Sequence, residues 1–204
     1  MKRNLLSSVA GVAAASFVAV SAISGQSMSP RPFAIGVYAG ASMPTGDFKG
    51  AADVGYHGGV FGSATLSGNV SVRLDGAYSD FGKKTVSGTN AVAVYGTKLF
   101  HTTLDAQYDL GSPTEIEAGG GSIPYISAGA GFYHFSYDDT CTGTQCAAPS
   151  FNESETRFGL NVGAGATFFL SGFTPFVDVH YHTISPKANE SRANMILGSF
   201  GLKF

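Results

Sequence analysis

The 204-residue sequence lacks tryptophan, has only two cysteines and is poor in charge, with charged residues making up 13% of the chain. Its formal net charge is −2, which gives no reason to expect binding to nucleic acid. From Pro32 onward no stretch repeats apolar residues with the 3.6-residue period of an amphipathic helix. These absences argue against a helical fold and against a nucleic-acid partner.

The long apolar stretch of the sequence lies at its start. Residues 1–27 begin with MKRN, continue through VAGVAAASFVAVSAI and reach small residues at Ala22, Ser24 and Gly25. This order is typical of a secretory signal peptide. A transmembrane anchor is the alternative, but serine and glycine dilute the stretch and no second span follows. We therefore expect export, with residues 28–204 forming one domain.

The two cysteines, Cys141 and Cys146, are separated by four residues in CTGTQC. In an oxidising destination this spacing favours one local disulfide, which contributes about 2 kcal/mol through loop-closure entropy. A metal site is the alternative, but it needs two further ligands that no nearby His or Cys supplies. We predict the disulfide and no metal.

Alternation of apolar and polar residues at period two recurs along the rest of the chain and predicts an all-β fold. The clearest case is Arg157–Leu170, where Phe158, Leu160 and Val162 alternate with polar or small residues. Residues 123–137 are rich in glycine and tyrosine, and the sequence does not fix their two faces. The predicted strands are 33–42, 53–66, 69–80, 91–109, 123–137, 157–170, 174–183 and 194–204.

The breaks between these strands predict an up-and-down topology, because such a barrel alternates long and short connections. Tight turns are expected at 67–69 and 171–173, and longer polar loops at 44–51, 83–90, 138–154 and 185–192. Residues 111–122 are the exception, since they are long where a short turn is expected.

Periodicity alone does not distinguish a soluble barrel from a membrane barrel, in which the apolar face points outward. Three features favour the membrane version. An export signal is expected, strands of about ten to twelve residues cross roughly 25 Å when tilted, and the polar faces combine small with charged residues. We predict a closed antiparallel up-and-down transmembrane β-barrel of eight strands.

The interior of an eight-stranded barrel is just wide enough for side chains, so glycines must make room for long neighbours. We expect Gly159, Gly163 and Gly165 to do so for residues such as Arg73. Charges buried there need partners of opposite sign, so Arg73 and Arg157 should pair with Asp75, Asp105 or Asp178. The predicted lumen network consists of Arg73, Asp75, Asp105, Arg157, Asp178, His180 and His182.

Three segments, GVYAGASMPTGDF, PYISAGAGFYHF and the alternating end at Phe204, resemble the small eight-stranded outer-membrane β-barrels of Gram-negative bacteria, the family of the OmpA transmembrane domain and OmpX. The resemblance covers the whole mature chain and implies an outer-membrane location. It also implies that Phe200, Leu202 and Phe204 form the aromatic terminal signal read by the barrel-assembly machinery, with Phe204 facing lipid. The expected partners are therefore this machinery, outer-membrane lipid and lipopolysaccharide, and we expect a monomer.

The sequence favours a non-enzymatic barrel that supports envelope integrity or binds a partner through its outer loops. A small pore is the first alternative, since the sequence does not exclude gaps in the lumen around the glycines. The second is a lipid A-modifying hydrolase, because His180, His182 and Ser185 lie near the end of one strand. Their spacing does not match the H-x-S-N pattern of lipid A deacylases, and the predicted register turns both histidines inward. No cofactor is expected, since GAGAT at 163–167 does not complete a GxGxxG loop.

Overall fold

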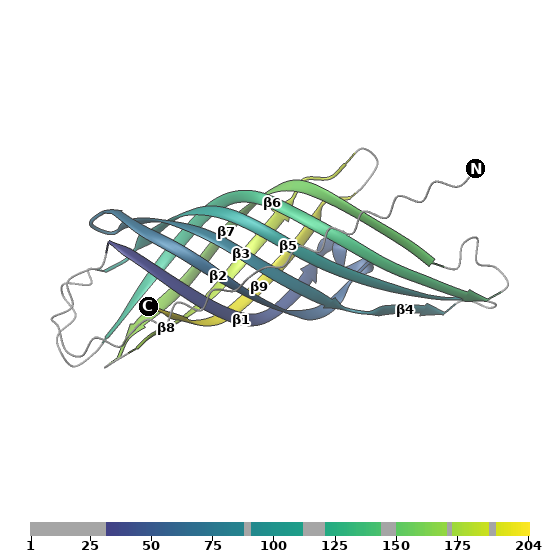
Figure 1. Ribbon diagram of the computed structural model, residues 1–204, viewed down its shortest axis with the longest axis horizontal. Coiled ribbons are helices and arrows are strands. Elements are labelled where there is room, and N and C mark those ends of the chain that lie inside the picture. Colours follow the sequence, from purple (N-terminus) through teal and green to yellow (C-terminus); the bar gives the residue numbers. More distant parts are fainter. Residues whose placement is uncertain (1–31, 88–90, 112–120, 144–149, 171–172, 188–190) are drawn as a thin grey trace, which may run out of the picture.

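The computed structural model describes residues 32–87, 91–111, 121–143, 150–170, 173–187 and 191–204. Its strands form one antiparallel sheet that curls into a barrel (Figure 1). The predicted strand bounds agree closely for five strands, including Ala91–Asp109. The strands are β1 (Phe33–Thr45), β2 (Asp53–Ser67), β3 (Val70–Gly82), β4 (Lys84–Ser87), β5 (Ala91–Asp109), β6 (Gly121–Gly143), β7 (Ser150–Phe169), β8 (Thr174–Ile184) and β9 (Ala193–Lys203).

The barrel closes because β1 pairs with β2 on one side and with β9 on the other, and β3 pairs with β5. Gly36 near the start of β1 lies opposite Lys203 at the end of β9. The first strand therefore begins, and the last strand ends, at the same end of the barrel. The short β4 also pairs with β5 and continues the line of β3 after Lys83. Eight strands therefore complete the ring, which confirms the predicted fold.

The barrel is apolar outside and polar inside. Large apolar side chains that face outward are exposed on every strand of the ring, whereas Arg73, Asp75 and Asp105 face inward and are buried. Such a surface is stable only against lipid, so the geometry favours a membrane barrel over a soluble one. Outward-facing residues of this belt include Ile35, Val37, Val60, Leu74, Phe100, Leu104, Phe132, Phe158, Leu160, Val179 and Phe200.

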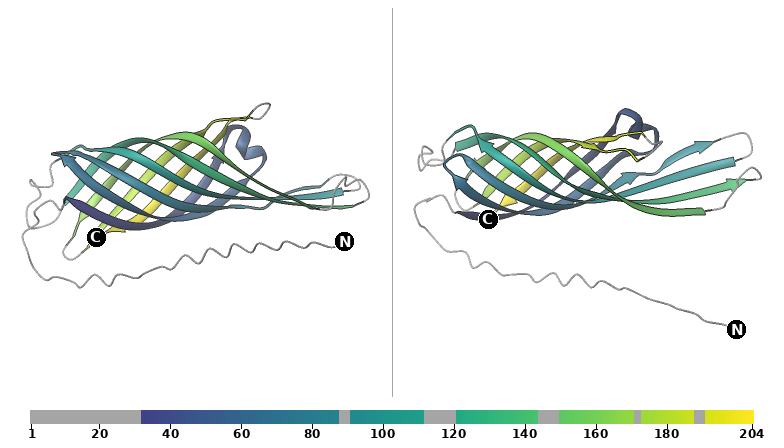
Figure 2. Two further views of the ribbon diagram at one scale, coloured as in Figure 1. Left: turned by 45° about the horizontal axis from the view of Figure 1, so that its top comes forward. Right: turned by 90° about the horizontal axis from the view of Figure 1, so that it is seen from above.

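One side of the barrel is much longer than the other. Strands β5, β6 and β7, joined by β4, run beyond the ring as a narrow sheet at the end opposite the C-terminus (Figures 1 and 2). The predicted loops at 83–90 and 138–154 are wrong in part, because the structure extends β6 to Gly143, begins β7 at Ser150 and inserts β4. The parts of β6 and β7 in this sheet meet water on both faces, so no apolar alternation marks them in the sequence. We call β4 and the parts of β5, β6 and β7 beyond the barrel the projecting sheet.

The connection between β1 and β2, predicted as a longer polar loop, folds over the barrel mouth. Residues 44–51 complete β1 and form the 3-10 helix η1 (Gly46–Gly50), which buries Phe48. Gly46 adopts a positive φ of 57°, a conformation that favours glycine at the turn into the helix. No helix among the described residues is long and apolar enough to cross a membrane.

Two predictions fall on residues outside the described ranges. The signal peptide lies at 1–27, and Cys146 lies between 144 and 149. Its predicted partner, Cys141, is part of β6. The signal peptide and the disulfide therefore remain predictions.

Candidate functional site: the lumen and outer mouth of the barrel

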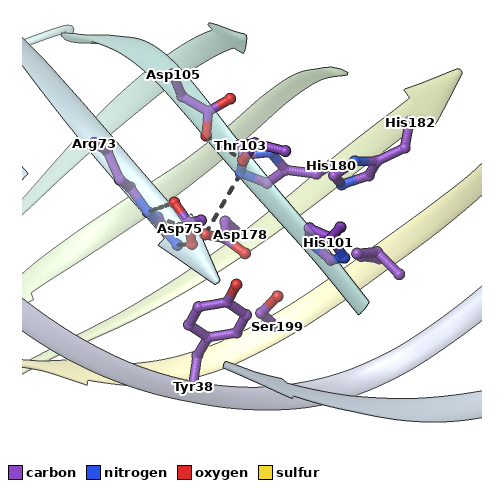
Figure 3. A pocket seen from close by; sticks show the side chains of 11 residues that line it. Tyr38, Arg73, Asp75, His101, Thr103, Asp105, Asp178, His180, His182 and Ser199 are labelled. Atoms are coloured by element: carbon purple, nitrogen blue, oxygen red, sulfur yellow. Dashed lines mark hydrogen bonds and ion pairs between the residues drawn. The ribbon is translucent and has the colours of Figure 1, made fainter. Parts of the chain in front are cut away.

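The centre of the lumen is an ion-paired cluster built on Arg73 of β3. Its Nε and Nη2 donate to the two oxygens of Asp75 at 2.6 and 2.8 Å, and its Nη1 donates to Asp178 Oδ2 at 3.2 Å. Arg73 and Asp75 share a face because they are two apart on one strand, while Asp178 reaches them from β8 (Figure 3). The guanidinium carbon also lies 3.9 Å from the centre of the Phe61 ring. The cluster thus fixes a buried cation between two carboxylates and an aromatic face.

A second buried carboxylate, Asp105, is held by neutral donors. Thr103 Oγ1 donates to it at 2.9 Å and Asn161 Nδ2 at 2.7 Å. A Cβ at Gly129, on the neighbouring strand, would lie 1.8 Å from its Oδ1, so only glycine leaves room for this carboxylate. The glycines predicted to make room do so, but for aromatic rings and not for Arg73. A Cβ on each would clash with Tyr133 at Gly159, with His180 at Gly163 and with Tyr125 at Gly165.

Four histidines line the lumen on the outer side of the arginine cluster. His57 lies between Ser42 and Ser199, at 3.2 and 3.0 Å, and His182 Nδ1 lies 2.8 Å from the Tyr133 hydroxyl. The His101 ring is 5.3 Å from that of His182, and His180 Nε2 is 3.6 Å from Asp178 Oδ2. Within the described part of the chain, no three His, Cys, Asp or Glu side chains are grouped to hold a metal ion.

Little free space remains in the middle of the lumen. The cavity between the arginine cluster and the histidines has a volume of about 20 Å³, room for about one water molecule. Above the histidines, an apolar plug fills the mouth, and the Phe48 ring of η1 packs edge-on against Phe81 and Phe135 at 5.2 and 5.9 Å. The plug consists of Phe48, Ala52, Phe81, Leu99, Tyr133, Phe135, Ile184, Ala193, Met195 and Leu197.

The barrel geometry agrees with comparisons to known proteins. The model of the outer membrane protein beta-barrel domain family matches residues 10–204. The chain belongs to this family. This protein therefore resides in the outer membrane, as the resemblance implied.

Solved structures of other outer-membrane proteins show the same fold. Neisserial surface protein A is 15% identical with a TM-score of 0.59, covering 85% of this chain and 96% of its own. OprG from Pseudomonas aeruginosa is 14% identical with a TM-score of 0.50, covering 84% and 95%. The outer membrane enzyme PagL is 19% identical, covering 84% and 98%, with a lower TM-score of 0.39. A comparison with curated protein sequences finds no match.

In an outer-membrane barrel the short turns face the periplasm and the longer connections face outward. The projecting sheet and η1 therefore lie at the extracellular end (Figure 2). On β7, Phe158 is the last apolar residue of the lipid-facing belt, and the outward positions beyond it, Thr156 and Ser154, are polar and exposed. Side chains of β7 before residue 157 thus lie outside the membrane.

A charged cluster at this outer mouth was missed as a unit by the sequence analysis. Arg157 forms an ion pair with Glu155, and Lys187 Nζ lies 2.7 Å from the other oxygen of that carboxylate. The Tyr137 hydroxyl donates to Glu155 Oε1 at 3.0 Å. Burial by itself would raise the pKa of Glu155, but hydrogen bonds from Lys187, Arg157 and Tyr137 outweigh burial and hold this pKa below its usual value. The cluster therefore stays ionised and ordered at neutral pH.

The predicted lumen network is thus divided between two places. Arg73, Asp75 and Asp178 meet in the centre, but Arg157 pairs with Glu155 near the mouth and not with the predicted aspartates. The alternation of β7 places Arg157 inward as predicted, but the predicted strand begins at Arg157 itself, so Glu155 and its pairing were not predicted. A charged residue two positions from Arg157 was the signal available.

The residues of the hydrolase alternative do not form a catalytic pair in the described structure. His182 is 4% exposed and bonds to Tyr133, while Ser185 lies beyond the end of β8 and is exposed. Near the mouth, Lys84 Nζ donates to the backbone oxygen of Lys49 at 2.6 Å. Phe200 in β9 and Phe204 just beyond its end are 59% and 49% exposed, and Leu202 alternates onto the same outward face.

Proposed function

We propose that this protein is a non-enzymatic outer-membrane barrel that holds the projecting sheet outside the cell and binds partners there. The observation that carries the proposal is the unequal strand length. β7 pairs with β6 as far as Ser150, but it pairs with β8 only from Gly159 onward. A barrel that served only to span the membrane would not need this extension.

The backbone of the projecting sheet is available for recognition. Among the described strands, none pairs with residues 150–157 of β7 on the side away from β6. Unpaired strand edges present a row of backbone donors and acceptors, and exposed edges of this kind are recurrent sites of partner binding. The closed ring itself has no such edge, so we expect the protein to be a monomer in the membrane.

The filled lumen argues against the alternative of a small pore. A solute would have to displace both the apolar plug and the Arg73 cluster, and the cavity between them holds about 20 Å³. Breaking a buried, hydrogen-bonded ion pair costs several kcal/mol, so thermal motion opens such a path rarely. The hydrolase alternative is disfavoured because His182 points into the lumen, away from lipid.

The test compares the full chain with a variant whose projecting sheet is shortened. Asp138 lies opposite Asn152, so an Asn-Gly turn in place of residues 139–151 closes that hairpin in register. Residues 84–95 are replaced in the same way. Both purified proteins are applied to an array of extracellular-matrix proteins and glycans, after heat-dependent gel mobility has shown that each barrel is folded.

The proposal expects binding to at least one arrayed surface that the shortened variant loses. A second experiment deletes the gene in cells and asks whether the shortened variant restores their resistance to detergent. If the shortened variant binds like the full chain, and if it also restores detergent resistance to deletion cells, the protein supports the envelope and the projecting sheet is not its binding surface.

A further inference from the structure

The outer mouth contains a pocket that the proposed function does not yet use. It has a volume of about 240 Å³ and is lined by Tyr137, Glu153, Glu155 and Arg157. These residues come from β6 and β7 at the place where the projecting sheet leaves the barrel. Lys187, in the connection after β8, reaches Glu155 from the far side. The pocket is thus formed by two neighbouring strands at the extracellular end, with Lys187 beside one of its lining residues.

The pocket is prebuilt from buried charged groups. The side chains of Glu155 and Arg157 are 5% and 8% exposed, although both are charged. The Arg157 guanidinium carbon lies 5.5 Å from the centre of the Phe135 ring, and the Tyr137 ring is stacked on Phe135 with an interplanar angle of 3°. These contacts fix the guanidinium and the tyrosine ring in place, so binding a ligand there requires little reordering.

Glu153 is the adaptable member of the pocket. Its side chain is exposed, and the structure gives it no hydrogen-bond or ion-pair partner among the described residues. It lies opposite Tyr137 in the β6–β7 register, so its carboxylate is next to the tyrosine ring. Lys187, with a side chain 52% exposed, offers further N–H donors nearby. A ligand in the pocket therefore meets an acceptor, a donor and an aromatic ring side by side.

The charges indicate what kind of ligand fits. Among the described residues, the two carboxylates Glu153 and Glu155 are balanced by Arg157 and Lys187, so these side chains together favour neither an anion nor a cation. A neutral ligand that both donates and accepts, and that has an apolar face for the ring, matches all three features. Sugar rings have this chemistry, since neighbouring hydroxyls donate and accept while the C–H groups form an apolar face.

We propose that this pocket binds a neutral hexopyranose unit, with Tyr137 packing against the sugar face and Glu153 accepting hydrogen bonds from its hydroxyls. The inference rests on the proposed binding role of the extracellular end. Such a sugar has two sources, the lipopolysaccharide of the protein's own membrane and glycans outside the cell, and both offer the same ring.

The experiment uses the full chain refolded in detergent free of lipopolysaccharide. Glucose, galactose, mannose and their oligosaccharides are titrated by calorimetry and by saturation-transfer NMR. We expect saturable binding in the millimolar range for at least one sugar, weakened about tenfold or more by Glu153→Gln and by Tyr137→Ala. Glu153 is exposed, so its variant tests the pocket even if Tyr137→Ala does not fold. Ser154→Ala, on the opposite face of β7, is the matched control and should bind within about twofold of the unchanged chain.

Absence of saturable binding at concentrations on the order of 100 mM would overturn the inference, as would equal binding by Glu153→Gln and the unchanged chain. Addition of purified lipopolysaccharide separates the sources. Competition with the soluble sugar assigns the pocket to membrane glycan, and lack of competition assigns it to glycans outside the cell. The proposed function and the sugar pocket can be refuted separately. If a sugar binds but no arrayed partner does, the proposed function alone is wrong. If an arrayed partner binds but no sugar does, this inference alone is wrong.

Discussion

Replacing Arg73 by methionine is the sharpest test of the lumen. Methionine keeps much of the side chain's length and packs well against the Phe61 ring, but it removes the charge that two buried carboxylates share. The change leaves Asp75 and Asp178 facing each other without their common cation. We expect the barrel to remain closed, because its backbone pairs do not depend on this residue, and to lose stability.

The magnitude follows from the geometry of the cluster. Removing one partner of a buried ion pair costs about 3–5 kcal/mol, since the remaining charge is left desolvated. Loss of the cation–π contact with Phe61 adds about 0.5–2 kcal/mol, and the sulfur–aromatic contact of methionine returns about 0.3–1.5 kcal/mol. The last two effects nearly cancel. The expected loss in the free energy of unfolding is therefore about 3–5 kcal/mol.

Reversible urea unfolding in detergent micelles measures this loss. With a slope of about 2.5 kcal/mol/M, the unfolding midpoint should fall by roughly 1 to 2 M. Lys98→Met is the matched control, because the Lys98–Asp138 pair is 44% and 55% exposed and should contribute less than about 1 kcal/mol. Adding Asp75→Asn and Asp178→Asn to Arg73→Met removes the unpaired charges and should restore most of the stability. If Arg73→Met and Lys98→Met shift the midpoint equally, the buried network does not stabilise the barrel.

Four further outcomes are expected. Pure protein in planar bilayers should show little steady conductance. Phe48→Ala should not create a large channel, because the Arg73 cluster still fills the lumen below. Large stable channels formed by the unchanged chain would contradict a closed lumen. Lipid A incubated with the protein should keep its acyl chains by mass spectrometry, and a loss that His182→Ala abolishes makes the protein a hydrolase. Phe204→Ser should lower assembly in cells yet permit refolding in detergent, since burial of one Phe contributes only about 1.5–3 kcal/mol; normal assembly removes the proposed signal role. The lowered pKa of Glu155 stabilises the fold above the pKa of an unfolded glutamate, and this stability is lost as pH falls through the folded pKa, so the melting temperature of Glu155→Gln should depend less on acid than that of the unchanged chain.

Strand bounds and faces were predicted best from the sequence for strands with one face toward lipid and the other toward the polar lumen. In β3 and β5 the outward residues are apolar and the inward ones polar, so the alternation gave both the bounds and the faces, including Arg73 and Asp105. In β6 this contrast is absent, because Phe132 faces lipid while Tyr133 and Phe135 fill the lumen. A strand with large rings on both faces has no period for a sequence pattern to reveal.

The outer end could not be predicted from alternation for two physical reasons. The parts of β6 and β7 in the projecting sheet meet water on both faces and are mostly polar, so they look like a loop, whereas its β5 part is apolar (AVAVY) and belongs to a predicted strand. The plug depends on a long-range contact, since Phe48 of η1 packs on Phe81 and Phe135, which are far away in the sequence. A lone phenylalanine in the polar stretch PTGDFKGA was the only local signal of that burial.

The two parts of the outer end also depend on each other. A narrow sheet with free edges is marginal in water, because two or three strands bury little apolar surface by themselves. Here the strands leave the barrel directly above Leu99 and Phe135 of the plug, which are fully buried. The Glu155 cluster lies at the same level and adds the connection after β8 through Lys187. A filled lumen therefore does more than exclude solutes, since it gives the projecting sheet a rigid base. Recognition should accordingly be strongest at that base, where the side chains of Tyr137, Glu155 and Arg157 are already held in place.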